Sequence, residues 1–375
     1  MKLLGLYVHI PFCARKCHYC DFVSYPGMEG SFERYIGSVV AEARLYSQNF
    51  KDHTVDTLFL GGGTPSLLTP KQVKALVCGL RDAFDFELKE ATIEANPESL
   101  DDEKPEAYAA CGLNRLSIGL QTHDDEILKR IGRGHAFERF LAAYQSAMRH
   151  VNNINIDVIF SLPAQTRESF GDTITNIIKL APRHVSAYSL KLEEGTKLAR
   201  EYSGADEDAD RDMYHCASQM LLEAGYTHYE TSNFAKENAQ CLHNMKYWTG
   251  GEYLGLGAAA HSYLSAQKKR FSNTENIHEY IQFVTKGKKP IAQEYVLTEK
   301  DEMTEYIMLR LRLSEGITFK GFSDRFCMDF KRVFGNAIDI AQKSGLIVKD
   351  EQGIYPTIKG FDLQNTLITE FMKII

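Results

Sequence analysis

Short apolar, β-branched runs alternate with amphipathic segments over the first half of the chain. Their length and composition predict buried strands at Leu3–His9, Val55–Leu60, Ala91–Glu94, Arg115–Leu120, Ile154–Phe160 and His184–Leu190. Between these strands, apolar residues recur at helical spacing and predict helices. One predicted helix starts at Ser31, and another starts at Thr69-Pro70, where a capping hydroxyl precedes a first-turn proline.

Six strand–helix units in succession predict an α/β fold with a parallel sheet and helices outside it. Six units are too few for a closed eight-fold barrel, so we predict an open, partial (β/α)6 barrel of the TIM type. In such folds ligands collect at the carboxyl ends of the strands.

The pattern changes in the second half. A helix starting in the acidic run Ala205–Asp212 is followed by a strand-like Tyr226–Phe234 and a Gly-rich Gly250–Gly257. From Thr298 onward three helices, a small hairpin and a last helix suggest a winged-helix-like module. Its mixed charges favour packing or interaction over nucleic-acid binding. We therefore expect a core domain at 1–235, a connecting segment at 236–297 and a C-terminal domain at 298–375.

Charge and hydropathy narrow the class of protein. The formal net charge is −7 at pH 7, which argues against a broad nucleic-acid-binding face. The N-terminal apolar stretch is too short for a signal peptide, and no apolar run reaches the length of about 18 residues that a membrane span needs. We expect a cytoplasmic protein without a transmembrane segment.

Three of the eight cysteines lie together as Cys13-x3-Cys17-x2-Cys20, directly after the first predicted strand. Thiolates are the natural ligands of iron–sulfur clusters, and three of them leave one iron of a [4Fe–4S] cube open to a chelating amino acid. S-adenosylmethionine (SAM) carries such a group. A tetrahedral zinc site completed by His18 or His9 is the alternative on spacing alone.

The string Tyr7-Val8-His9-Ile10-Pro11-Phe12-Cys13, with Cys17, Tyr19 and Cys20, resembles the oxygen-independent coproporphyrinogen III oxidase family of radical SAM proteins. The resemblance extends over nearly the whole chain, including the C-terminal domain. It implies that Cys13, Cys17 and Cys20 hold a [4Fe–4S] cluster to which SAM binds.

A SAM site is expected at the strand ends. Gly61-Gly62-Gly63-Thr64 follows the second strand, where glycines allow the backbone to approach a ligand closely and their N–H groups can bind the SAM carboxylate or ribose. Asp157 lies inside an otherwise apolar strand and needs partners if it is buried. The resemblance implies that the SAM cavity is lined by Tyr7, Tyr19, Gly62, Gly63, Thr64, Glu94, Gln121, Arg133 and Asp157.

Two features differ from the oxidases of the family. Phe22 stands where the oxidases have a fourth cysteine, and only six residues precede Tyr7, where the oxidases carry a long extension. The segment His243-Asn244-Met245-Lys246-Tyr247-Trp248 is similar to the signature of the family's haem-chaperone branch. Imidazole ligates haem iron and aromatic rings stack on porphyrin, so we predict haem contacts at His243, Tyr247 and Trp248, with Cys241 a second candidate ligand.

Because this segment follows the sixth strand, we expect it to lie outside the SAM cavity. The function favoured is a haem chaperone that retains a SAM-binding cluster and delivers haem to a client protein. The alternatives are oxidative decarboxylation of coproporphyrinogen and radical chemistry on an unrelated substrate, so enzyme activity is left open and no catalytic residue is assigned. Homodimer formation or peripheral membrane association is compatible with the sequence.

Overall fold

The computed structural model describes residues 1–375, and its centre is a 12-stranded sheet. The middle of the sheet is a run of neighbouring strands that are parallel throughout. These strands are β1 (Lys2–Ile10), β4 (His53–Gly62), β5 (Asp85–Ala95), β6 (Arg115–Gln121), β7 (Asn153–Phe160) and β8 (His184–Ser189). All six predicted strands are therefore confirmed.

Shorter strands extend the sheet at both ends. On the β1 side lie β11 (Tyr253–Leu256), β12 (His261–Leu264), β13 (Lys269–Asn273) and β14 (Ile291–Val296), and on the β8 side lie β10 (Asn233–Ala235) and β9 (Thr227–Glu230). β11 is parallel to β1, whereas the strands beyond it are antiparallel. The segment 236–297, expected as a connection, thus contributes four strands to the main sheet.

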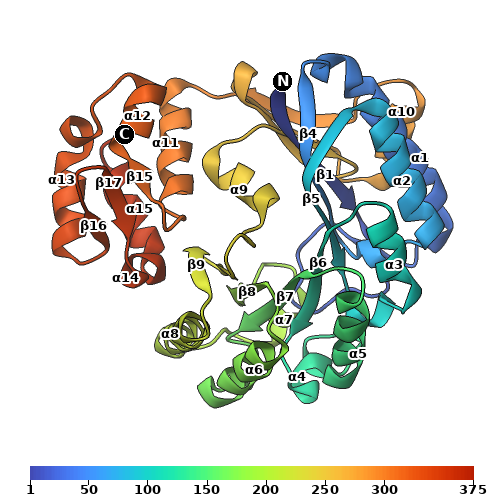
Figure 1. Ribbon diagram of the computed structural model, residues 1–375, viewed down its shortest axis with the longest axis horizontal. Helices are drawn as coiled ribbons and strands as arrows, with labels where there is room; N and C mark the ends of the chain where they lie inside the picture. The colour runs from blue at the N-terminus through green and yellow to red at the C-terminus, as the bar shows by residue number, and fades with distance from the viewer.

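Helices cover the outside of the curved sheet (Figure 1). They are α1 (Phe32–Ser47), α2 (Pro70–Ala83), α3 (Glu103–Ala110), α5 (Phe137–Met148), α6 (Arg167–Leu180), α8 (Glu207–Glu223) and α10 (Ile277–Thr285). Two short helices, α4 (Asp125–Arg130) and α7 (Lys197–Glu201), instead contact His18 of the cysteine loop. The predicted start of α2 is confirmed, because Thr69 and Gln72 form a reciprocal capping box ahead of Pro70. The open (β/α)6 barrel predicted from the sequence is the observed architecture.

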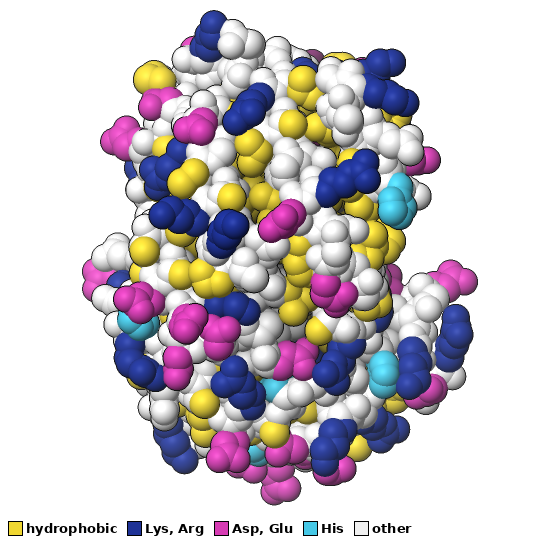
Figure 2. Space-filling model, turned by 90° about the vertical axis from the view of Figure 1, so that its right-hand side faces the viewer, with side chains coloured by type: hydrophobic (Ala, Val, Ile, Leu, Met, Phe, Trp, Pro, Cys, Tyr) yellow, Lys and Arg dark blue, Asp and Glu magenta, His cyan; other side chains and the backbone are white.

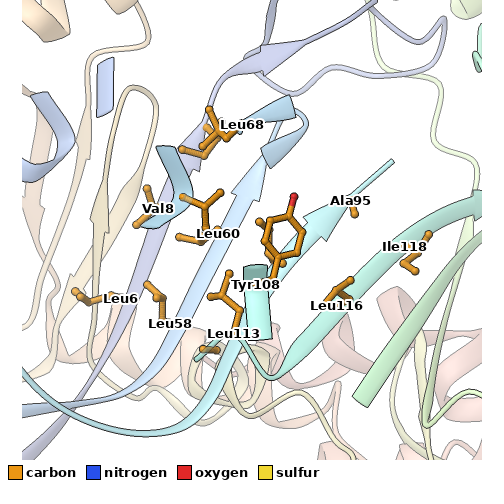
Figure 3. Packing of buried hydrophobic residues seen from close by; sticks show 14 of the residues in the cluster. Leu6, Val8, Leu58, Leu60, Leu68, Ala95, Tyr108, Leu113, Leu116 and Ile118 are labelled. Carbon is orange, nitrogen blue, oxygen red and sulfur yellow. The ribbon is translucent and has the colours of Figure 1, made fainter. Parts of the chain in front are cut away.

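Side chains alternate between the two faces of the sheet. Leu6 and Val8 of β1, Leu58 and Leu60 of β4, and Leu116 and Ile118 of β6 point to the outer helices, where they pack with residues such as Tyr108 (Figure 3). This layer belongs to a core of 58 buried residues. The period of two places the intervening residues of each strand on the concave face, and many of these are polar.

The C-terminal domain is a separate core beside the barrel (Figure 1). It contains α11 (Glu299–Arg310), α12 (Phe319–Phe326), α13 (Phe330–Lys343), α14 (Ile358–Asp362), α15 (Gln364–Met372) and a sheet of β15 (Ile317–Thr318), β17 (Gly353–Pro356) and β16 (Ile347–Lys349). The three helices and the hairpin are found in the predicted order, but two helices, α14 and α15, follow the hairpin instead of one, and β15 adds a third strand to it. No helix in the structure has the length and apolar character needed to span a membrane.

Candidate functional site

The three clustered cysteines face the mouth of the barrel. Cys13 ends β2 (Phe12–Cys13), which pairs with β3 (Tyr25–Pro26), and the loop between these strands carries Cys17 and Cys20. His9 of β1 contacts this loop, because its Nε2 lies 2.9 Å from the carbonyl oxygen of Val23. All three cysteines line one cavity of about 380 Å³.

The positions of these thiols bear on whether they hold a zinc ion or an iron–sulfur cluster, the two sites that their spacing allows. A zinc ion with Zn–S bonds of about 2.3 Å would draw its sulfur ligands to about 4 Å from one another. No three His, Cys, Asp or Glu side chains converge in this way on a single ion. A cubane binds each thiolate at a different iron, so a cluster does not require the three sulfurs to converge on one ion.

A chain of polar contacts joins two of the cysteines through the strand ends. Arg133 lies beside Cys17, with Nη1 3.8 Å from Sγ, and its Nη2 donates to Oδ1 of Asn96 at 2.8 Å. Asn96 donates to Thr64, whose hydroxyl lies 3.5 Å from the sulfur of Cys13. These contacts together fix the cysteine loop relative to β4 and β5.

The Gly-rich loop is built for close packing. Gly62 has φ of +107°, and a Cβ there would lie 2.5 Å from the ring of His9, while a Cβ at Gly63 would lie 2.6 Å from the carbonyl oxygen of Phe12. The N–H groups of Gly62, Gly63 and Thr64 donate to Glu94, Ile10 and Phe12, respectively. The backbone N–H groups of these three residues therefore already donate within the protein, and the glycines let the loop lie against β1 and β2.

Buried acids lie next to this loop. Burial raises the pKa of Glu94 to about 8, with nearby Asp157 acting in the same direction, although the N–H of Gly62 donates to its carboxylate at 2.9 Å. Asp157 accepts from Ser117 and from Asn155, each at 2.8 Å, so the predicted need for partners is met. Burial also raises the pKa of Asp157. The cavity thus holds two carboxyl groups of reduced acidity.

The structure brings the predicted SAM residues together. Tyr19, Gly62, Gly63, Thr64, Glu94, Gln121, Arg133 and Asp157 line the same cavity as the three cysteines. Tyr7 lines an adjoining cavity of about 220 Å³, which shares with the first Phe22, Gly62, Glu94, Ser117, Asp157 and Tyr188. Sequence reasoning missed Asn96, Ser117, Asn155 and Tyr188, although the alternation along each strand places Ser117, Asn155 and Tyr188 on the concave face.

Helix α9 (Leu242–Thr249) forms the floor of the adjoining cavity. It lies within the curve of the sheet, between the barrel strands and α11 (Figure 1). Glu90 of β5 accepts from the backbone N–H groups of Leu242 and His243, both at 3.0 Å, and so satisfies the N-terminus of α9. His243, Asn244 and Tyr247 line the cavity. The segment therefore lies outside the cavity that holds the cysteines, as expected, but it lines the adjoining cavity with Tyr7, because α9 turns back into the barrel.

His243 is wholly buried, and both of its ring nitrogens have partners. Nδ1 lies 2.9 Å from the hydroxyl of Thr57, and Nε2 lies 2.8 Å from the hydroxyl of Tyr247. Burial lowers its pKa to about 3. Ligation of haem iron would have to break one of these contacts, so this geometry favours a packing role; Trp248 faces the other way, toward Arg312. The buried Cys241 lies 3.4 Å from Glu90.

Comparison with known proteins gives a consistent family. The Radical SAM superfamily matches residues 7–177, and the HemN C-terminal domain matches residues 297–363. A heme chaperone HemW of Lactococcus lactis is 35% identical, with 98% of this chain and 96% of that protein covered. The HemW of Haemophilus influenzae is 34% identical, with 98% of each chain covered.

A solved structure shares the fold. The coproporphyrinogen III oxidase HemN of Escherichia coli, described as a radical SAM enzyme, superposes with a TM-score of 0.87 over 99% of this chain and 90% of that one. At 24% identity this likeness concerns the fold alone. Full-length similarity to the curated relatives decides the family: the chain is a radical SAM protein and belongs to the HemW family.

Proposed function

We propose that this protein is a haem chaperone that binds haem and delivers it to a client protein, while holding a [4Fe–4S] cluster and SAM in the barrel. The observation that carries the proposal is similarity over the full chain to proteins named heme chaperone HemW. Phe22, which is exposed, also supports it, because the oxidases of the family are expected to carry a fourth cysteine at this position.

Cys13, Cys17 and Cys20 are the residues that would hold the cluster, and Arg133 would stabilise the charge on Cys17. When bound, the cluster supplies an open iron for SAM and a source of an electron. The residues proposed to bind SAM are Tyr7, Tyr19, Gly62, Gly63, Thr64, Glu94, Gln121, Arg133 and Asp157. Their support is that they surround two adjoining cavities at the carboxyl ends of the strands.

The competing function is oxidation of coproporphyrinogen, which the shared fold with HemN allows. Two anaerobic incubations of the reconstituted protein separate the functions. In the first, reduced protein and SAM are given coproporphyrinogen III, and we expect no protoporphyrinogen. In the second, the protein is loaded with haem and mixed with a haem-free acceptor protein. We expect haem transfer, measured as the appearance of the acceptor's haem absorbance.

Multiple turnovers to protoporphyrinogen would overturn the chaperone proposal and support the oxidase. Absence of both product and haem transfer would also contradict it. The predicted haem contacts at His243, Tyr247 and Trp248 are a separate matter, because this assay measures haem transfer and not which residues contact the haem.

A further inference from the structure

Each of the three clustered cysteines has a hydrogen-bond donor beside its sulfur, and the donors differ in charge. The hydroxyl of Thr64 lies 3.5 Å from Sγ of Cys13, and Nη1 of Arg133 lies 3.8 Å from Sγ of Cys17. The sulfur of Cys20 accepts from a backbone N–H two residues further along the chain. The donor at Cys17 is therefore the only cation of the three.

The contacts at Cys13 and Cys17 are joined in one directed chain of hydrogen bonds. Nη2 of Arg133 donates to Oδ1 of Asn96 at 2.8 Å, and Nδ2 of Asn96 donates to the hydroxyl oxygen of Thr64 at 3.1 Å. A guanidinium only donates, so it fixes the amide of Asn96 with the oxygen toward Arg133. Thr64 then accepts from Asn96 and keeps its own proton for Cys13. We call the chain Arg133–Asn96–Thr64 the relay.

The guanidinium of Arg133 is held in place without a carboxylate in contact. Nη2 also donates to the carbonyl oxygen of Gly119 at 2.8 Å, and a Cβ at Gly119 would lie 3.0 Å from that nitrogen. Arg133 forms no ion pair, and nearby Glu98 pairs instead with Arg15 at 3.3 Å. On the side of the barrel covered by α1, α2 and α10, by contrast, Lys and Arg side chains lie in solvent among Asp and Glu (Figure 2).

We propose that Arg133 raises the reduction potential of the [4Fe–4S] cluster, directly at Cys17 and through the relay at Cys13. Reduction adds one electron to a cluster that its three thiolate ligands already make negative. A fixed positive charge stabilises the more negative, reduced state by the larger amount. Hydrogen bonds to the ligand sulfurs act in the same direction, and bonds in series polarise one another, so the charge is felt at both sulfurs.

This inference rests on the proposed function and deepens it, because it names what sets the readiness of the cluster to take an electron. Arg133 acts through ligand sulfurs and not on the iron, so it is a positioning residue for the cluster. It is also among the residues proposed to bind SAM. A measurement on protein that holds the cluster alone separates the two roles.

The test is a potentiometric titration of the full-length, anaerobically reconstituted protein without SAM. Dithionite is the reductant, and electron paramagnetic resonance measures the reduced cluster. Arg133→Gln removes the charge and should lower the ratio of reduced to oxidised cluster at a fixed solution potential by about tenfold or more, which is a shift of about 59 mV for one electron. Arg133→Lys keeps the charge and should recover most of this shift.

A matched control and a second pair of variants complete the test. The guanidinium of Arg139 also donates to a main-chain carbonyl, that of Leu100, but contacts no cysteine, so Arg139→Gln should match the wild type. Thr64→Val exchanges the hydroxyl beside Cys13 for a methyl group and should lower the ratio by less than Arg133→Gln, because the donor lost is neutral. Thr64→Ser keeps a hydroxyl and should match the wild type. Iron and sulfide are measured so that only fully loaded proteins are compared.

The outcomes separate this inference from the proposed function. Equal potentials in fully loaded Arg133→Gln and wild type would overturn the inference and leave the cluster assignment standing. An Arg133→Lys protein as hard to reduce as Arg133→Gln would also overturn it, because the charge would then have no effect. If Arg133→Gln loads no cluster, the Thr64 pair decides: a lower potential in Thr64→Val than in Thr64→Ser supports the relay, and equal potentials overturn it. If the wild type loads no cluster, the inference and the cluster assignment fail together.

Discussion

Replacing His243 with alanine separates a packing role from haem ligation. The imidazole is fully buried beneath the barrel cavity, and the side chain and backbone of His243 together link α9 to β4 and β5. One ring nitrogen contacts Thr57 of β4 and the other contacts Tyr247 one turn along α9, while the backbone N–H of His243 donates to Glu90 of β5. The substitution removes both side-chain contacts and leaves the backbone contact in place.

The loss of stability follows from these contacts. Large-to-small changes in a core cost about 2–5 kcal/mol, and each buried hydroxyl left without a partner costs about 1–3 kcal/mol. The adjoining cavity can admit water to the freed hydroxyls of Thr57 and Tyr247, which offsets part of this cost. We therefore expect His243→Ala to lower the free energy of unfolding by about 2–4 kcal/mol at pH 7.

The size of this effect should depend on pH. Burial lowers the pKa of His243 to about 3, below the value of about 6.5 in an unfolded chain, so between these values the unfolded state binds the extra proton. The wild type then loses about 1.4 kcal/mol per pH unit through this group as the pH falls from about 6.5 toward 3. The variant lacks that term, so the difference between the two proteins should shrink as the pH falls.

Trp248 is the only tryptophan of the chain and lies on the same helix, so its fluorescence reports on this region directly. Urea denaturation at pH 7 and pH 5 would be followed by this fluorescence and by circular dichroism. The exposed His278, changed to alanine, is the control and should shift stability by less than about 0.5 kcal/mol. Unchanged stability in His243→Ala, together with weaker haem binding and an altered Soret band, would refute the packing argument and establish His243 as the ligand.

Three other predictions concern the cluster, SAM and the domain contact. Cys17→Ser should lose the roughly four iron and four sulfide per chain of the reconstituted protein, while Cys78→Ser and Cys327→Ser keep them; full cluster content in Cys17→Ser would contradict the assignment. Gly62→Val should weaken SAM binding by calorimetry, because a Cβ at positive φ would meet His9, whereas Gly30→Val has open space; equal affinities in the two variants would remove the proposed site. Asp362→Asn should lower stability by about 1 kcal/mol, and less at high salt, because Asp362 joins the C-terminal domain to Arg211 and His215 of α8; a salt-independent loss would contradict the ionic explanation.

The barrel was predictable because its outer face is regular. Runs such as Ile154–Phe160 contain enough apolar residues to signal a buried strand, and the cap at Thr69 marks a helix start in the sequence itself. The residues that line the cavity were harder to predict from the sequence. The concave-facing Ser117 and Asn155 were absorbed into runs interpreted as buried strands, although strict alternation within each strand would have separated the two faces.

The position of α9 could not be predicted from the residues of the helix itself. Its N-terminus is held by Glu90, a residue more than 150 positions earlier, whose carboxylate accepts from two N–H groups of the helix. Nothing within His243–Trp248 records that contact. The same limit applies to Arg133, which looks like a surface cation in sequence but joins Cys17 to Asn96 in the fold.

The arrangement of the two barrel cavities bears on whether cluster binding and haem binding are coupled. The cavities at the barrel mouth and floor share Glu94 and Asp157, so a ligand in one changes the electrostatic environment of the other. If haem docks outside these two cavities, cluster loading and haem loading should be separable, and Cys17→Ser would bind haem without the cluster. A protein whose haem affinity falls with cluster content would instead require haem at the barrel mouth, beside Phe22.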